Sequence, residues 1–202
     1  MRATETLKDE HRVIEQVLNS LERIAEQGRE KGILCIQDAS DALDFFRDFA
    51  DGCHHKKEED QLFPLLEARG MPRQDGPTGV MRTEHEQGRE LIRAMRRALD
   101  AAAAHCEGAV EQFANYADSY VKFLRAHIDK EDHCLFAMAD SMLTSADQER
   151  LEAGFATIEH EQDYPHRHDR YLTIASELAK HYHVAGTGAA HAQATCRGTH
   201  RT

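Results

Sequence analysis

Four segments of the chain place apolar residues three and four positions apart, which is the spacing of one face of an α-helix. The first covers residues 4–29, and the others follow it as far as Met142. Their apolar positions are Leu7, Ile14, Leu18 and Leu21; Leu43, Phe46, Ala50, Leu62 and Leu65; Met81, Gly88, Ile92, Met95 and Leu99; and Phe113, Ala117, Tyr120, Leu124, Leu135, Met138 and Met142. The connections are short, so the sequence predicts an all-α fold, an up-down-up-down antiparallel four-helix bundle.

The domain organisation follows from where this pattern stops. Residues 1–143 are predicted to form the bundle, and residues 144–183 a C-terminal helical appendage whose first helix has Ser145 as its N-cap and whose second runs from about His168 to His183. The last stretch, 184–202, is small, polar and aperiodic. It is predicted to be a disordered tail.

Composition excludes several classes of partner. The 202 residues carry a formal net charge of -11, which disfavours binding to nucleic acid or to an anionic membrane. No apolar run approaches the roughly 20 residues of a membrane-spanning helix, and the N-terminal residues lack the apolar core of a signal peptide. The five cysteines include no CxxC pair. A cytoplasmic protein without a disulfide framework is therefore expected.

Each of the four apolar stripes also contains a histidine, and two contain a glutamate one turn later on the same face. The histidines are His11, His54, His85 and His127, and the glutamates are Glu58 and Glu131. An ionised glutamate is almost never fully buried unless it is paired or bound to metal. Lys and Arg are scarce on these stripes, whereas imidazole and carboxylate are ordinary ligands of divalent metals. The pattern predicts a pair of metal ions in the bundle core.

An internal repeat supports this prediction. The segment HHKKEEDQLFPLLE at 54–67 aligns without a gap on HIDKEDHCLFAMAD at 127–140. Upstream, DEH ends at His11, 43 residues before His54, and TEH ends at His85, 42 residues before His127. The chain is therefore predicted to contain two helical hairpins related by pseudo-twofold symmetry, each of which supplies two histidines and one glutamate.

The second helix contains two His-x-x-x-Glu pairs, because His55 and Glu59 have the same spacing as His54 and Glu58. Superposing the Leu-Phe pairs of the repeat places His54 and Glu58 opposite the His and Glu of the second half, and His55 opposite Ile128. The alignment favours His54 and Glu58 as the ligands. Substitution of His55 or Glu59 is then expected to leave the metal content nearly unchanged.

Taken together, these residues resemble the hemerythrin-like, or HHE cation-binding, family over about residues 5–142. The resemblance implies a non-haem di-iron centre of two ions per chain, bridged by two carboxylates and an oxo or hydroxo ligand. Position by position, it implies that four histidines are terminal ligands and two glutamates are bridges: His11, His54, His85 and His127, with Glu58 and Glu131. Zinc or manganese in a structural site is a weaker alternative, because ligand type alone does not select iron.

One position departs from the family's oxygen carriers, which have a fifth histidine one turn after the third. Arg89 stands there, and a guanidinium offers no lone pair to a metal. Arg89 is expected either to lie near a bound anion or to extend to solvent. Two further side chains leave alternatives open: Glu15 as an extra oxygen ligand or an ordinary carboxylate, and Tyr120 as a hydrogen-bond donor to a bound ligand or a core residue.

The function implied by this resemblance is that of the family's intracellular members, which are associated with nitric oxide response, repair of iron-sulfur centres, iron and oxygen sensing, or peroxide handling. The expected protein binds O2, peroxide or NO and reduces or disproportionates it with electrons from a donor that the sequence does not identify. The alternative is a non-catalytic sensor of iron or gas, whose appendage reports occupancy to a partner. Reversible oxygen carriage is less favoured, because of Arg89.

Overall fold

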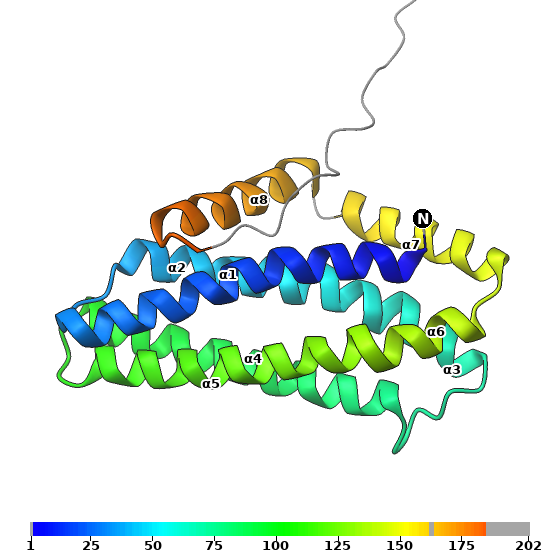
Figure 1. Cartoon of the computed structure of the whole chain (residues 1–202), viewed down its shortest axis with the longest axis horizontal. Coiled ribbons are helices and arrows are strands. Elements are labelled where there is room, and N and C mark those ends of the chain that lie inside the picture. The colour runs from blue at the N-terminus through cyan, green and yellow to red at the C-terminus, as the bar shows by residue number, and fades with distance from the viewer. Residues whose placement is uncertain (1, 162–163, 185–202) are drawn as a thin grey trace, which may run out of the picture.

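The structure is a computed structural model that describes residues 2–161 and 164–184. All regular secondary structure in these ranges is helical, which confirms the predicted all-α class (Figure 1). The elements are α1 (Ala3–Lys31); α2 (Ile36–Phe45), continued by the π-helical segments η1 (Phe46–His55) and η2 (Glu58–Leu62) and by α3 (Phe63–Ala68); α4 (Pro77–Ala103); α5 (Ala109–Lys130), continued by the π-helical segment η3 (Glu131–Leu135) and by α6 (Phe136–Met142); α7 (Ser145–Glu161); and α8 (Tyr164–His181).

Two helix ends differ from the sequence prediction. Helix α1 does not end near Gly28, which is buried within the helix, but at Gly32, whose φ of 69° is the left-handed conformation that favours glycine. At the start of α7, the capping residue is Thr144 instead of Ser145. The backbone N–H of Asp147 donates to Thr144 Oγ1 at 3.3 Å, and the Asp147 carboxylate accepts from the Thr144 N–H at 2.9 Å.

The long helices lie side by side along most of their length (Figure 1). Helix α5 packs against α1 and α4, and α2 packs against α1 and α4 from the other side. The connections at 32–35, 69–76 and 104–108 are short. The amphipathic faces of these helices therefore enclose a common interior.

That interior contains two apolar clusters, one toward each end of the helices. The larger includes Ile14, Phe46 and Phe113, and the smaller includes Leu7, Phe63 and Phe136. The histidines and glutamates predicted as ligands fall between the two clusters along each helix. Apolar packing on both sides therefore closes this polar layer off from bulk water.

The π-helical segments change which residues face the interior. A π-turn holds one more residue than an α-turn, so it shifts the phase of the residues that follow. After η3, Phe136 and Ala139 are buried, while Met138 is 41% exposed and Met142 is only partly buried. The prediction that Met138 continues the apolar stripe was wrong, because it assumed an unbroken α-helical period, whereas Met142 packs against the smaller cluster as predicted.

Helices α7 and α8 lie one after the other along the face formed by α1 and the α2 region (Figure 1). Tyr171 and Tyr182 of α8 donate hydrogen bonds to Asp48 at 2.6 Å and Asp38 at 2.7 Å. The predicted boundary near 143 falls in the short connection between α6 and α7, and α8 begins four residues before the expected His168. Apart from Val184, the predicted tail at 184–202 lies outside the described residues.

None of the helices in the described ranges combines the length and the apolar character that crossing a membrane requires.

Candidate metal centre

The six predicted ligands converge on the polar layer between the apolar clusters. Each of them has at most 1% of its surface exposed. They come from α1 (His11), η1 (His54), the first residue of η2 (Glu58), α4 (His85), α5 (His127) and the first residue of η3 (Glu131). Both glutamates begin a π-helical turn, a feature that is rare and frequently marks functional sites.

Three of the four distances from the glutamates to their histidines match those between ligands of one metal ion, and the fourth is slightly longer. Two ligands about 2.1 Å from one ion and 90–110° apart lie about 3.0–3.4 Å from each other. Glu131 Oε2 lies 3.3 Å from Nε2 of His11 and 3.3 Å from Nε2 of His127. Glu58 Oε2 lies 3.4 Å from Nε2 of His85 and 3.8 Å from Nε2 of His54. Each glutamate therefore lies between two histidines.

The donor atoms form two groups, in each of which they all lie within 4.8 Å of one another. The first group contains His11, His54, Glu58 and Glu131. The second contains His85 and His127 together with His55, which the sequence alignment had placed away from the site. Because Glu131 and Glu58 each contact one histidine of either group, the geometry suits two ions that share the carboxylates.

The inner atoms of these residues lack ordinary partners. Among the described residues, no hydrogen bond reaches Nε2 of His11, His54, His85 or His127, nor either carboxylate oxygen of Glu58 and Glu131. A buried polar atom without a partner costs about 1–3 kcal/mol, and an unpaired charge costs more. Eight such atoms in one layer fit a site that a cation completes, so these residues fit the metal that the sequence implies.

The outer nitrogen of each histidine faces a carboxylate. Since a carboxylate only accepts, each Nδ1 carries a hydrogen, which leaves Nε2, facing the interior, as the atom that a metal can bind. The Nδ1 pairs are His11 with Asp132 at 2.8 Å, His54 with Glu10 at 2.9 Å, His85 with Glu59 at 2.6 Å, and His127 with Glu84 at 2.9 Å. This arrangement fixes the ring orientation and tautomer that metal-binding histidines require.

A cation stands behind each of these outer carboxylates. Arg12 contacts Asp132, Lys57 contacts Glu10, Arg89 contacts Glu59 and Lys130 contacts Glu84. The outer carboxylates are thus compensated by Lys and Arg, whereas among residues 2–161 and 164–184 the only basic side chains in contact with Glu58 and Glu131 are histidines. The negative charge of the inner layer is therefore the one that a bound metal cation would balance.

The supporting residues follow the internal repeat, although the sequence reasoning did not assign them. The glutamate before each first histidine, Glu10 or Glu84, holds the second histidine of the same half. The acid after each inner glutamate holds the first histidine of the other half: Glu59 holds His85, and Asp132 holds His11. The sequence feature that could have revealed Glu59 and Asp132 is the Lys-Glu-acid run that occurs in both halves of the repeat, at 57–59 and 130–132.

Burial sets the proton distribution of the metal-free layer. It lowers the pKa of His54 and His85 well below the ordinary value, so both rings stay neutral and keep a lone pair. Burial and the neighbouring Glu131 charge raise the pKa of Glu58 well above its usual range. Burial also acts to raise the pKa of Glu131, but His127 and His11 outweigh it and lower this pKa to about 2. Glu58 therefore favours its protonated form in the metal-free layer.

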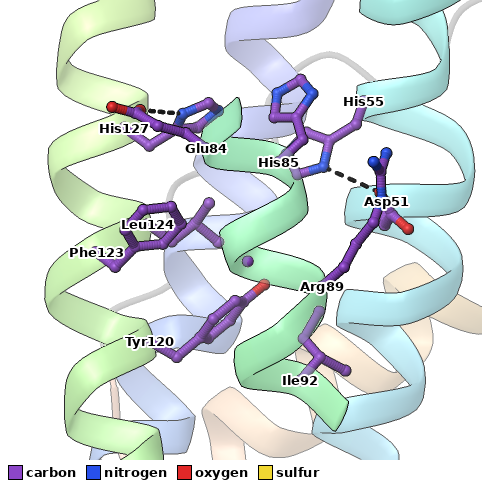
Figure 2. A pocket seen from close by; sticks show the side chains of 11 residues that line it. Asp51, His55, Glu84, His85, Arg89, Ile92, Tyr120, Phe123, Leu124 and His127 are labelled. Carbon is purple, nitrogen blue, oxygen red and sulfur yellow. Dashed lines mark hydrogen bonds and ion pairs between the residues drawn. The ribbon is translucent and has the colours of Figure 1, made fainter. Parts of the chain in front are cut away.

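A small cavity of about 10 Å³ adjoins the group that contains His85 (Figure 2). Its lining includes Tyr120, Arg89, His55 and His127. A cavity of this size has room for about one water molecule. Tyr120 is buried, and its ring packs edge-on against Phe46 with a centroid distance of 5.0 Å, so it is a core residue that also borders the cavity.

The remaining sequence candidates lie outside the inner layer. Arg89 neither extends freely to solvent nor faces the layer: its guanidinium contacts Asp51 at 2.8 Å, Glu59 at 2.8 Å and Glu86 at 2.6 Å. Glu15 forms an ion pair with Arg12 at 2.8 Å and is partly exposed. Glu15 is therefore an ordinary surface carboxylate in this structure.

The fold and this layer define a class of protein, a helical metal-binding domain with histidine and carboxylate ligands. Comparison with known proteins agrees: the Hemerythrin HHE cation binding domain matches residues 2–139. The chain belongs to this family, whose domain binds metal cations.

Curated relatives include proteins of Mycobacterium bovis and Mycobacterium tuberculosis, both described as uncharacterized. Each is 28% identical over 162 residues, which cover 78% of this chain and 61% of the relative. The matched region thus spans about three fifths of the length of these relatives. No solved structure matches the chain.

Proposed function

We propose that this protein binds two iron ions per chain between the helices of an up-down-up-down bundle and uses them to bind O2, peroxide or NO and to reduce or disproportionate it. The observation that carries the proposal is the inner layer of eight partnerless imidazole and carboxylate atoms. The proposed ligands are those that the sequence indicated: His11, His54, His85 and His127, with Glu58 and Glu131 shared between the ions.

Iron supplies ferrous and ferric states and an open position for a small ligand. The chain's own residues prepare that chemistry. The outer carboxylates accept the Nδ1 protons, and so leave the four Nε2 atoms directed inward. The apolar clusters on either side exclude water, and the cavity beside Tyr120 admits only a molecule of about the size of water. A space of that size favours a small ligand over larger substrates.

A non-catalytic sensor is the second candidate, and the contacts of the C-terminal helices favour it. Lys57 Nζ lies 2.7 Å from Glu159 of α7 and also contacts Glu10, which holds His54. Tyr171 of α8 contacts Asp48 in η1. A change at the metal layer could therefore reach α7 and α8 through a few hydrogen bonds. A structural zinc or manganese site is a third candidate. All three are proposed for a cytoplasmic protein.

The test is elemental analysis of the purified protein, combined with visible spectra and peroxide consumption. The proposal expects about two irons per chain, a spectrum that changes on adding peroxide, and catalytic loss of peroxide. Two irons without turnover of peroxide, O2 or NO would favour the sensor. Redox-silent metal would select the structural site, and one ion or none after iron supplementation would refute the dinuclear proposal.

A further inference from the structure

We infer that His55 is a seventh metal ligand, so that the ion beside His85 and His127 is held by three histidines. This inference rests on the proposed iron binding and adds to it a residue outside the expected ligand set. It makes the two metal positions chemically unequal, because the other position has two histidines, His11 and His54.

The position of the His55 ring is the first argument. His55 is 6% exposed, and a ring nitrogen lies within 4.8 Å of those of His85 and His127. The ring stacks on His85 with a centroid distance of 3.8 Å and an interplanar angle of 13°, and meets His127 nearly edge-on at 5.7 Å. Three imidazoles thus converge on one point, which is a common arrangement for a transition metal.

The backbone supplies the second argument. In a regular α-helix consecutive residues project about 100° apart, and a π-helix, which has more residues per turn, brings them closer together in projection. His54 and His55 are the last two residues of the π-helical η1, and both are buried, each with a ring nitrogen in a different group. Because η1 is π-helical, His54 and His55 do not exclude each other, and both can belong to the site.

The surroundings of His55 supply the third argument. Asp51, one turn earlier, lies 3.4 Å from His55 Nδ1, and Arg89 Nε lies 2.8 Å from the same Asp51 oxygen (Figure 2). Because Asp51 accepts a proton, the lone pair of His55 lies on Nε2. This is the same order of histidine, carboxylate and cation that supports the other four histidines.

Arg89 also keeps the place beside His85 free for His55. Arg89 follows His85 by one turn of α4. Its guanidinium contacts Asp51 and Glu59, the carboxylates that face Nδ1 of His55 and His85. Arg89 thus supports two of the three histidines without occupying the metal position, and His55 provides the third nitrogen there.

The experiment compares iron binding in three proteins loaded with 57Fe(II) under anaerobic conditions. His55→Phe keeps a ring that can stack on His85 but removes both nitrogens, and His133→Phe changes a histidine that is 73% exposed. We expect wild type and His133→Phe to hold two irons with two distinct Mössbauer sites. We expect His55→Phe to lose about one iron, or to bind the second at least tenfold more weakly, with the loss of one site.

A measurement on the unmodified protein avoids the risk that His55→Phe does not fold. In the 1H NMR spectrum of the ferrous protein with 15N-labelled histidine rings, each ligand ring gives one strongly shifted N–H signal. Five such signals support the inference and four overturn it, as would an unchanged iron content and Mössbauer spectrum in folded His55→Phe. If the wild-type protein binds no iron, the proposed function itself fails, which is a different outcome.

Discussion

At the scale of single residues, the outer carboxylates are neutralised by nearby cations, whereas the two inner glutamates lie next to each other. Each outer carboxylate contacts both a histidine and a cation, whereas Glu58 is fully buried beside the negative charge of Glu131. Substituting the two kinds of residue by glutamine should therefore have different effects on stability and on metal binding.

We predict that Glu58→Gln stabilises the metal-free protein, increasingly so as the pH rises. The pKa of Glu58 is raised in the folded state, so its contribution to stability is fully present below its unfolded pKa of about 4.5 and is lost as pH rises through the folded pKa. Glutamine cannot ionise. The difference in melting temperature between variant and wild type, both stripped of metal, should grow from pH 5 to pH 8.

The control for this prediction is Asp60→Asn, which removes an exposed carboxyl group two residues away. Its melting temperature should follow wild type across the same pH range. With iron present, Glu58→Gln should hold at most one ion per chain. If the difference in melting temperature between metal-free Glu58→Gln and wild type did not change with pH, ionisation of Glu58 would not destabilise the fold, and the prediction would be wrong.

We predict that Glu84→Gln weakens iron binding about 10-fold to 100-fold, because Glu84 accepts the Nδ1 hydrogen of His127 and an amide can present its NH2 group instead. The measurement is competition for Fe(II) with a chelator of known affinity. Glu90→Gln, on the same helix but 70% exposed, is the matched control and should bind iron like wild type. Equal affinities for all three proteins would remove Glu84 from the site.

At the scale of helices, the two halves of the repeat place equivalent lysines in different surroundings. Lys57, the residue before η2, has no exposed surface, because α7 covers this part of the chain. The equivalent Lys130 is 42% exposed. Both contact the glutamate that holds a histidine, Glu10 or Glu84. The repeat thus provides an internal comparison of a buried and an exposed ion pair.

We predict that Lys57→Met destabilises the metal-free protein by about 3–5 kcal/mol, because it leaves the buried Glu10 without its cation. Lys130→Met should cost no more than about 1 kcal/mol, since solvent screens the remaining charge. Urea denaturation followed by circular dichroism measures both. Similar losses in the two variants would mean that the cover of α7 does not matter to this pair.

At the scale of the whole molecule, metal binding and folding should be linked. An ion that binds only the native state stabilises it by about 4 kcal/mol at a thousandfold excess over its Kd. For a chain of this size, that corresponds to a melting temperature higher by roughly 10 °C. We predict a fall of this order when iron is removed by a chelator, measured by calorimetry. His54→Ala, with its metal site broken, should show a much smaller response to the chelator.

Much of the site could be predicted from the sequence, because helical periodicity places residues at i and i+4 on one face. That relation is local, so one His-x-x-x-Glu pair in each half indicated that Glu58 and Glu131 face the interior. The internal repeat then added a histidine from each of the other two helices. The all-α class follows from the same periodicity. The pairing of Glu10 with His54, 44 residues apart, depends instead on how two helices pack.

What only the tertiary structure decided is the phase of the helices near the site. A constant α-helical period would make His54 and His55 alternatives and would place Met138 in the interior. The π-helical η1 and η3 change that phase, so His55 is buried and Met138 is exposed. A π-turn is less stable than an α-turn when only the local backbone is considered. It depends on packing from neighbouring helices, which no single stretch of sequence contains.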